Sequence, residues 1–148
     1  MPRVSFYLSG GTEERLRLKI ACRLAEQAYL SGQKILVSMQ DPSQLQRFDD
    51  LLWTFADRSF VPHEPYREDA QWQDTPVLLG CDTQPQRSFD LLINLTDAMP
   101  PAVPLANQVA EIIDGDDARR KAGRARFRQY RDQGMTLETH DIAAEQAP

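Results

Sequence analysis

The sequence predicts a three-layer α/β domain with a mainly parallel sheet flanked by helices. Short apolar runs of strand length alternate with segments of helical periodicity, and such strands are typical of parallel sheets covered on both faces. The length of 148 residues is enough for one domain with a sizeable core. We expect residues 1–142 to form this single domain and residues 143–148 to form a flexible C-terminal tail, because the tail has little to bury.

The first part of the chain alternates strand and helix twice. Residues 4–8 predict a buried strand. A helix is then expected between an N-cap at Thr12 and a stop at Ser31-Gly32, because apolar residues recur at helical spacing between them. A second strand follows at residues 35–39. Asp41-Pro42 has the order of cap and proline that begins many helices, and it predicts the second helix.

The second part of the chain is less regular. Prolines and scattered charges over residues 53–74 predict a long loop or short irregular pieces. Three further apolar runs predict strands at residues 77–79, 91–95 and 109–113, of which the third is expected to be the last core strand. The acidic turn at residues 115–117 then begins a helix that runs to about Gln133, with Gly134 as its stop.

Composition excludes several classes of protein. No apolar run approaches the ~20 residues of a membrane span, and the N-terminus lacks the apolar region of a signal peptide. Cys22 and Cys81 are too few for a disulfide scaffold, which favours a reduced, cytoplasmic setting. The net charge of −5 conceals a run from Arg119 to Arg131 with seven basic residues and no acid. The rest of the chain is strongly acidic and should not bind nucleic acid over a broad surface, but this basic segment could bind an acidic ligand.

No catalytic or cofactor motif is supported by the sequence. Gly10-Gly11 follows the first strand, where a phosphate-binding loop would lie, but it lacks the spacing and the lysine of the known motifs. His63 and His140 do not have metal-ligand spacing, and Cys22 is most simply a buried structural thiol. We therefore expect no enzymatic activity, no cofactor and no metal. A small nucleotide-binding protein or enzyme on the same type of fold is the alternative.

One stripe of the last predicted helix combines positive charge with an aromatic ring. Arg120, Arg124, Phe127 and Arg131 follow the spacing i, i+4, i+7 and i+11, which places them along one side of a helix. Guanidinium groups bind carboxylates bidentately and the ring can pack an apolar group, so the stripe suits a peptide that carries both. A solvated basic helix with Phe127 in the core and a phosphate-binding helix are the alternatives.

A second cluster concentrates apolar area where the second helix ends. Residues 51–55 and 59–63 contain Trp53, Phe55 and Phe60, followed by Pro62. Aromatic clusters on loops often anchor protein interfaces. Filling of the core is the alternative interpretation.

Taken in order, these stretches resemble the chi subunit family of the bacterial DNA polymerase III holoenzyme. The resemblance covers essentially the whole chain. Its most specific part is the helix end Asp50-Leu51-Leu52-Trp53 followed by Ser59-Phe60-Val61-Pro62-His63. The other matching stretches are residues 4–8, 31–37, 90–95 and 126–131.

The resemblance implies a Rossmann-like α/β fold without a nucleotide-binding or catalytic role, in an accessory of the clamp-loader assembly. Members of this family pair with the psi subunit. They also bind the acidic, phenylalanine-ended C-terminal tail of single-stranded-DNA-binding protein, so that their contact with single-stranded DNA is indirect.

The family's binding residues carry over by position. The psi interface falls on Trp53, Phe60, Val61, Pro62 and His63, and the tail site falls on Arg120, Arg124 and Phe127. Arg131 continues the same stripe. The turn at residues 115–117 is more acidic than the family leads us to expect, and Ile113 is assigned to the apolar wall of the tail pocket in its place.

Overall fold

The computed structural model describes residues 2–56, 59–67, 74–81, 83–85 and 87–142, so the expected tail at residues 143–148 lies outside the described residues. Helices and strands alternate along most of the described chain, as the sequence predicts. Their order is β1 (Arg3–Leu8), α1 (Glu14–Leu30), β2 (Ile35–Met39), α2 (Pro42–Thr54), β3 (His63–Pro65), β4 (Val77–Cys81), β5 (Phe89–Asn94), the short 3₁₀ helix η1 (Val103–Leu105), β6 (Ala106–Ile113), α3 (Asp117–Asp132) and β7 (Thr136–Asp141).

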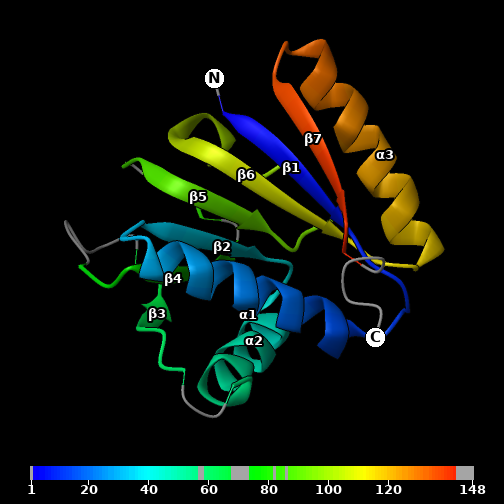
Figure 1. The fold of residues 1–148 in the computed structure, drawn as a ribbon. Coiled ribbons are helices and arrows are strands. Elements are labelled where there is room, and N and C mark those ends of the chain that lie inside the picture. Colours follow the sequence, from blue (N-terminus) through cyan, green and yellow to red (C-terminus); the bar gives the residue numbers. More distant parts are fainter. Residues whose placement is uncertain (1, 57–58, 68–73, 82, 86, 143–148) are drawn as a thin grey trace.

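The strands form one seven-stranded sheet in the order β3-β4-β2-β5-β6-β1-β7 (Figure 1). Every pair of neighbouring strands is parallel. All five residues of the inner strand β2 are buried, as expected for a strand covered on both faces. The predicted α/β class with a mainly parallel sheet is confirmed.

Helices cover both faces of the sheet, which gives the predicted three layers. Figure 1 shows α1 and α2 on one face and α3 on the other. Side chains of α1 and α2, among them Ala21 and Phe48, pack in one buried apolar cluster. Tyr130 of α3 packs with Val4 and Phe6 of β1 in the second cluster, on the opposite face.

Local sequence signals fix most helix ends. Asp41 is the N-cap of α2, and its carboxylate accepts a hydrogen bond of 2.8 Å from the Gln44 amide. Pro42 occupies the first helical position, where its missing N–H costs nothing. Gly32 and Gly134 follow α1 and α3 with φ of 78° and 82°, a region that favours glycine. The predicted caps at these ends are confirmed.

The predicted N-cap at Thr12 is wrong. Helix α1 begins at Glu14, and its N-cap is Glu13, which makes no side-chain capping hydrogen bond. The carbonyl of Glu13 accepts from the amides of Leu16 and Arg17. The charge of Glu14 in the first turn stabilises this end through the helix dipole, so the helix forms without a capping hydroxyl.

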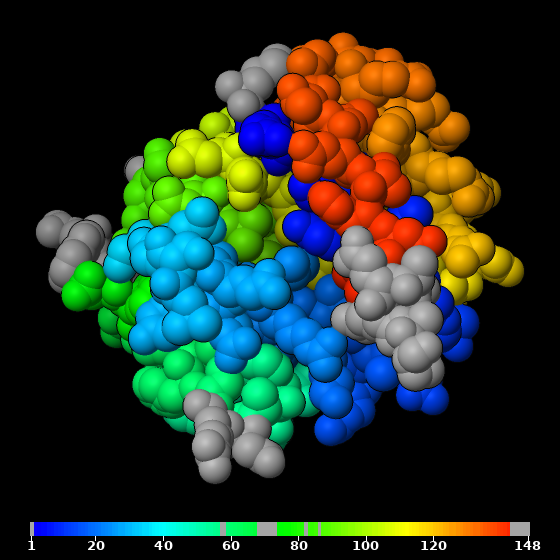
Figure 2. Space-filling model, in the orientation of Figure 1, coloured from blue at the N-terminus to red at the C-terminus, as the bar shows by residue number. Residues whose placement is uncertain are grey.

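Two edge strands are not evident in the sequence. The short strand β3 lies within the segment predicted to be irregular, and β7, which the sequence does not predict, follows α3. Residues 109–113 lie in β6 and are all buried, so the prediction that they form the last core strand is confirmed. Both β3 and β7 are edge strands, and no residue of either strand is buried as a whole. Figure 2 shows β7 on the surface between α1 and α3. An edge strand needs no apolar run, and this explains why the hydrophobic pattern misses both.

Candidate functional site

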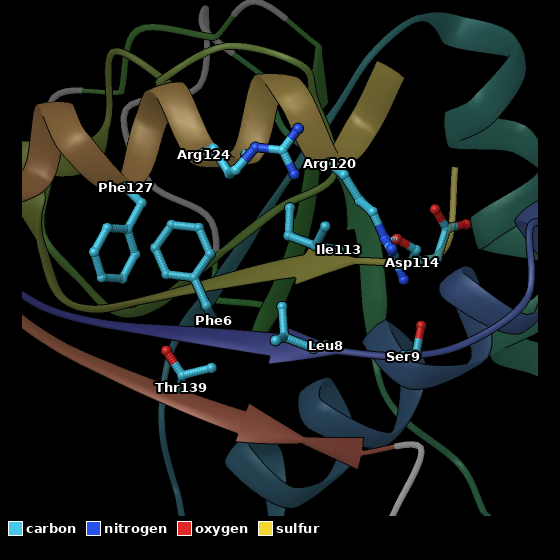
Figure 3. A pocket seen from close by; sticks show the side chains of 10 residues that line it. Phe6, Leu8, Ser9, Ile113, Asp114, Arg120, Arg124, Phe127 and Thr139 are labelled. Carbon is cyan, nitrogen blue, oxygen red and sulfur yellow. Dashed lines mark hydrogen bonds between the residues drawn. The ribbon is translucent and has the colours of Figure 1, made fainter. Parts of the chain in front are cut away.

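A pocket of about 410 Å³ opens between α3 and the carboxyl ends of β1 and β6. Figure 3 shows that its side chains come from α3 on one side and from β1, β6 and β7 on the other. In a parallel sheet the carboxyl ends of all strands lie at the same end of the sheet, and ligand sites of α/β sheets commonly lie there. The pocket has an apolar wall and an arginine-bearing rim.

The apolar wall comes from three elements. Phe6 and Leu8 belong to β1, Ile113 to β6 and Phe127 to α3. The rings of Phe6 and Phe127 lie 5.3 Å apart, and strand register sets Leu8 beside Ile113 and Phe6 beside Thr139. Ile113 and Phe127, two of the residues predicted for the tail site, both line this wall. The wall can pack one aromatic or aliphatic side chain.

Gly123 allows α3 to lie close to β6 beside this wall. A Cβ atom at this position would lie 2.8 Å from Cδ1 of Ile113, which is too close without a shift of that side chain. Glycine inside a helix lowers helix stability by about 1 kcal/mol relative to alanine. Its presence between arginines in the middle of a predicted helix is the one signal in the sequence that indicates this close packing.

Two arginines of α3 form the rim of the pocket. Nε of Arg120 donates a hydrogen bond of 3.2 Å to the carbonyl oxygen of Asp114. Arg124 is exposed, and its side chain makes no hydrogen bond or ion pair within the described residues. Arg131 does not line the pocket, and its Nε lies 3.6 Å from a carboxylate oxygen of Asp132. The structure therefore brings together Arg120 and Arg124, but not Arg131.

The acidic turn before α3 is held by its own hydrogen bonds. Nε and Nη2 of Arg119 donate to the two carboxylate oxygens of Asp114 at 2.8 and 2.7 Å, and the Asp116 amide donates to the first of them. Burial raises the pKa of Asp114, but these hydrogen bonds outweigh it and hold the pKa below its usual range. Asp116 is the N-cap of α3. Of the acids at positions 114, 116 and 117, Asp114 and Asp116 thus have internal partners.

A buried ionic network fixes α3 to the sheet behind the pocket. Glu111 of β6 is fully buried and accepts hydrogen bonds from Arg126 at 3.0 and 3.1 Å, from Asn94 and from the Tyr130 hydroxyl. Nη1 of Arg126 donates to the carbonyl of Asp97. Burial, reinforced by the Glu111 carboxylate, raises the pKa of Tyr130, which therefore stays protonated and donates. A glutamate inside an apolar strand is the sequence signal for this network.

Two of the three aromatic residues predicted at the end of α2 lie on the surface, while Phe55 is half-buried and packs against the core. Trp53 and Phe60 are 56% and 61% exposed, and their ring centroids are 5.6 Å apart. Val61 is buried in the core. The His63 side chain is covered, with its ring 4.9 Å from that of Trp53 and its Nδ1 2.7 Å from the Val61 carbonyl. Trp53 and Phe60, the exposed apolar pair, form what we call the aromatic patch. His63 packs against Trp53 beneath the patch, and Pro62 is half-buried.

The remaining candidate motifs have structural roles. Burial raises the pKa of the Cys22 thiol to about 12, so the thiol is protonated and inert, as predicted. The carbonyl of Gly11 accepts a hydrogen bond of 2.6 Å from the Gly115 amide. The glycine turn at residues 10–11 therefore packs against the turn before α3. Across the described part of the chain, no group of three potential metal ligands is present. No helix there is long and apolar enough to cross a membrane.

Comparison with known proteins gives one consistent family. Residues 1–138 match the family model described as DNA polymerase III chi subunit, HolC. The DNA polymerase III subunit chi of Pseudomonas aeruginosa is 41% identical over 142 residues, which is 96% of this chain and 98% of the relative. That of Haemophilus influenzae is 35% identical over 124 residues, covering 84% and 86%. The crystal structure of T4 UvsW superposes on 95% of this chain and 41% of its own, with a TM-score of 0.67 and 10% identity, a likeness of fold alone.

Proposed function

The chain belongs to the DNA polymerase III chi subunit family, and from this premise we propose that it acts as a non-catalytic adaptor in DNA replication. In this proposal the aromatic patch binds the psi subunit. The pocket beside α3 binds the acidic, phenylalanine-ended C-terminal tail of single-stranded-DNA-binding protein. Contact with single-stranded DNA is then made through that protein.

The pairing of an apolar wall with a basic rim is the observation that carries the tail assignment. A terminal phenylalanine offers one ring and one carboxylate on a single residue. The wall of Phe6, Ile113 and Phe127 suits the ring, and Arg120 and Arg124 suit the carboxylate and the acids before it. Inorganic phosphate would use the rim but leave the apolar wall empty, so a peptide is the better match.

The exposure of Trp53 and Phe60 supports the assignment of the aromatic patch to the psi subunit. Large apolar side chains on a monomer surface are typical of protein interfaces when they cluster, and Trp53 and Phe60 are adjacent and both more than half exposed. The patch lies at the end of α2, on the face of the sheet opposite α3 (Figure 1). The two sites therefore do not overlap, so that one partner need not displace the other.

Substitution of Arg124 tests the tail site. Arg124→Ala should weaken binding of a synthetic tail peptide by about 1.5–3 kcal/mol, the range for a hydrogen bond to a charged group. Arg124→Lys should recover only part of the loss, because an ammonium group cannot reproduce the bidentate contact. Isothermal titration calorimetry at several salt concentrations measures both, and the affinity should fall as salt rises.

Arg128→Ala is the matched control, since Arg128 is an exposed arginine of α3 that does not line the pocket. It should bind the peptide almost as the unmodified chain does. Equal binding of a scrambled peptide of the same composition, or an unchanged affinity in Arg124→Ala, would reduce the site to a solvated basic helix. Tight binding of a bare single-stranded oligonucleotide would contradict indirect contact with DNA.

The peptide itself provides a separate test of the apolar wall. Removing its terminal phenylalanine should cost at least as much as removing Arg124, because the ring and its burial against Phe6 and Phe127 are both lost. Replacing that residue by leucine should recover part of the affinity. Calorimetry at high salt isolates this contribution, since the charged contacts are then screened. A truncated peptide that binds at full strength would rule out the wall as a phenylalanine site.

A further inference from the structure

An acid lines a pocket to which we assign an acidic ligand. Asp114 is among the residues that line it, at the carboxyl end of β6. Only 2% of the residue is exposed, and both of its carboxylate oxygens accept hydrogen bonds from Arg119. A negative charge at this position would repel the peptide if it acted only through its field. The hydrogen bonds around it indicate a different role.

We propose that Asp114 is a positioning residue that holds Arg120 ready to bind the tail. Its carboxylate ties down the turn, and its carbonyl oxygen then receives Nε of Arg120. With Nε occupied by the protein, the two terminal nitrogens of Arg120 are the groups left to meet a carboxylate of the peptide. This inference rests on the proposed function, because it assigns a role within the same pocket.

The hydrogen bonds show how firmly this turn is held. The Asp114 carboxylate accepts from the Asp116 amide at 3.1 Å as well as from Arg119. Nη2 of Arg119 also donates to the carbonyl of Thr12 at 3.3 Å. The Gly115 amide donates to the Gly11 carbonyl, and a Cβ at Gly115 would lie 2.7 Å from that oxygen. The turn is thus clamped to the β1–α1 connection, and the carbonyl that holds Arg120 has a fixed direction.

The hydrogen bonds that hold the turn favour binding because they preorganise Arg120. A free arginine side chain loses rotamer freedom when a ligand immobilises it, and that loss reduces affinity. Arg120 is anchored at Nε before the ligand arrives, so part of the loss has already occurred on folding. Arg119 faces the Asp114 carboxylate and is therefore not available to the peptide. The acidic turn divides two adjacent arginines between a structural role and a binding role.

Two substitutions of Asp114 distinguish positioning from a simple charge effect. Asp114→Asn removes the negative charge, so a charge effect alone predicts tighter binding of an acidic peptide, whereas loss of positioning predicts binding about three- to tenfold weaker. Asp114→Glu keeps the charge and displaces the carboxylate, so a charge effect predicts no change and positioning again predicts a loss. Calorimetry with the phenylalanine-ended acidic peptide gives both affinities.

Asp117→Asn is the matched control, because Asp117 is an exposed acid of the same turn. Its affinity should equal that of the unmodified chain or slightly exceed it. A double-mutant cycle adds a readout that mere destabilisation would not produce. In an Arg120→Ala background, Asp114→Asn should cause almost no further loss of affinity, because the side chain that it positions is absent.

The outcomes separate this inference from the proposed function. If the unmodified chain does not bind the peptide, the proposed function fails. If it binds and Arg120→Ala weakens it, but Asp114→Asn and Asp114→Glu bind as well or better, the positioning role is wrong. Equal losses from Asp114→Asn with and without Arg120 would also overturn it. Should Asp114→Asn fail to fold, as shown by circular dichroism, Asp114→Glu decides the question.

Discussion

Replacing Glu111 with alanine should lower the free energy of unfolding by about 3–5 kcal/mol, the usual cost of removing one partner of a buried ion pair. Arg126 would be left with its charge in the core, where its side chain is 4% exposed. Asn94 and Tyr130 would lose an acceptor as well. A chain of this size has roughly 5–15 kcal/mol of stability in total, so the variant should be close to unfolding at physiological temperature.

Urea unfolding followed by circular dichroism measures this loss. Arg128→Ala, an exposed arginine on the same helix, should change stability by no more than about 0.5 kcal/mol. The double variant Glu111→Leu with Arg126→Met should be more stable than Glu111→Ala, because no charge is then stranded in the core. A loss below about 1 kcal/mol in Glu111→Ala would mean that α3 is held mainly by apolar packing.

Replacing Phe60 with alanine should weaken binding of the psi subunit by about 2 kcal/mol or more, as expected of an aromatic anchor at the centre of an interface. The ring is 61% exposed in the isolated chain, so its removal leaves no cavity and should leave the fold intact. Trp53 would lose its neighbour at 5.6 Å. Surface plasmon resonance with immobilised psi subunit measures the change, and thermal unfolding checks the fold.

Leu16→Ala is the control for this prediction. Leu16 is 48% exposed, and it lies in the first turn of α1, near the glycine turn and away from the aromatic patch. It should bind psi normally. If Phe60→Ala and Leu16→Ala behave alike, or if neither alters binding, the psi subunit does not bind at the aromatic patch.

Much of the fold could be predicted because its signals are local. Apolar runs define the inner strands, and Asp41 with Pro42 begins α2 through contacts within a single turn. The same holds for the aromatic patch, where Trp53 and Phe60 lie close together in sequence. A pattern that is completed within about ten residues needs no knowledge of the rest of the chain.

The pocket could be predicted only in part, because pairing of strands far apart in the sequence brings its lining residues together. Phe127, Arg120 and Arg124 share one helix, and their spacing reveals them. Phe6 and Thr139 are paired only by the register of β1 with β7, and β7 has no apolar run to indicate that it is a strand. Arg131 follows the same helical spacing but does not line the pocket, so spacing alone does not ensure that a side chain reaches it.

The two candidate sites lie toward opposite edges of the seven-stranded sheet. His63, beneath the aromatic patch, begins the edge strand β3, and Thr139 of the pocket belongs to the opposite edge strand β7. Inner strands buried on both faces make this body a stiff spacer. Under the proposed function, a partner bound at one site would be held at a set distance from the other site, so its effective concentration there would depend on the dimensions of the sheet rather than on a flexible linker. If the proposed function holds, tethering through this sheet is enough to join the two assemblies.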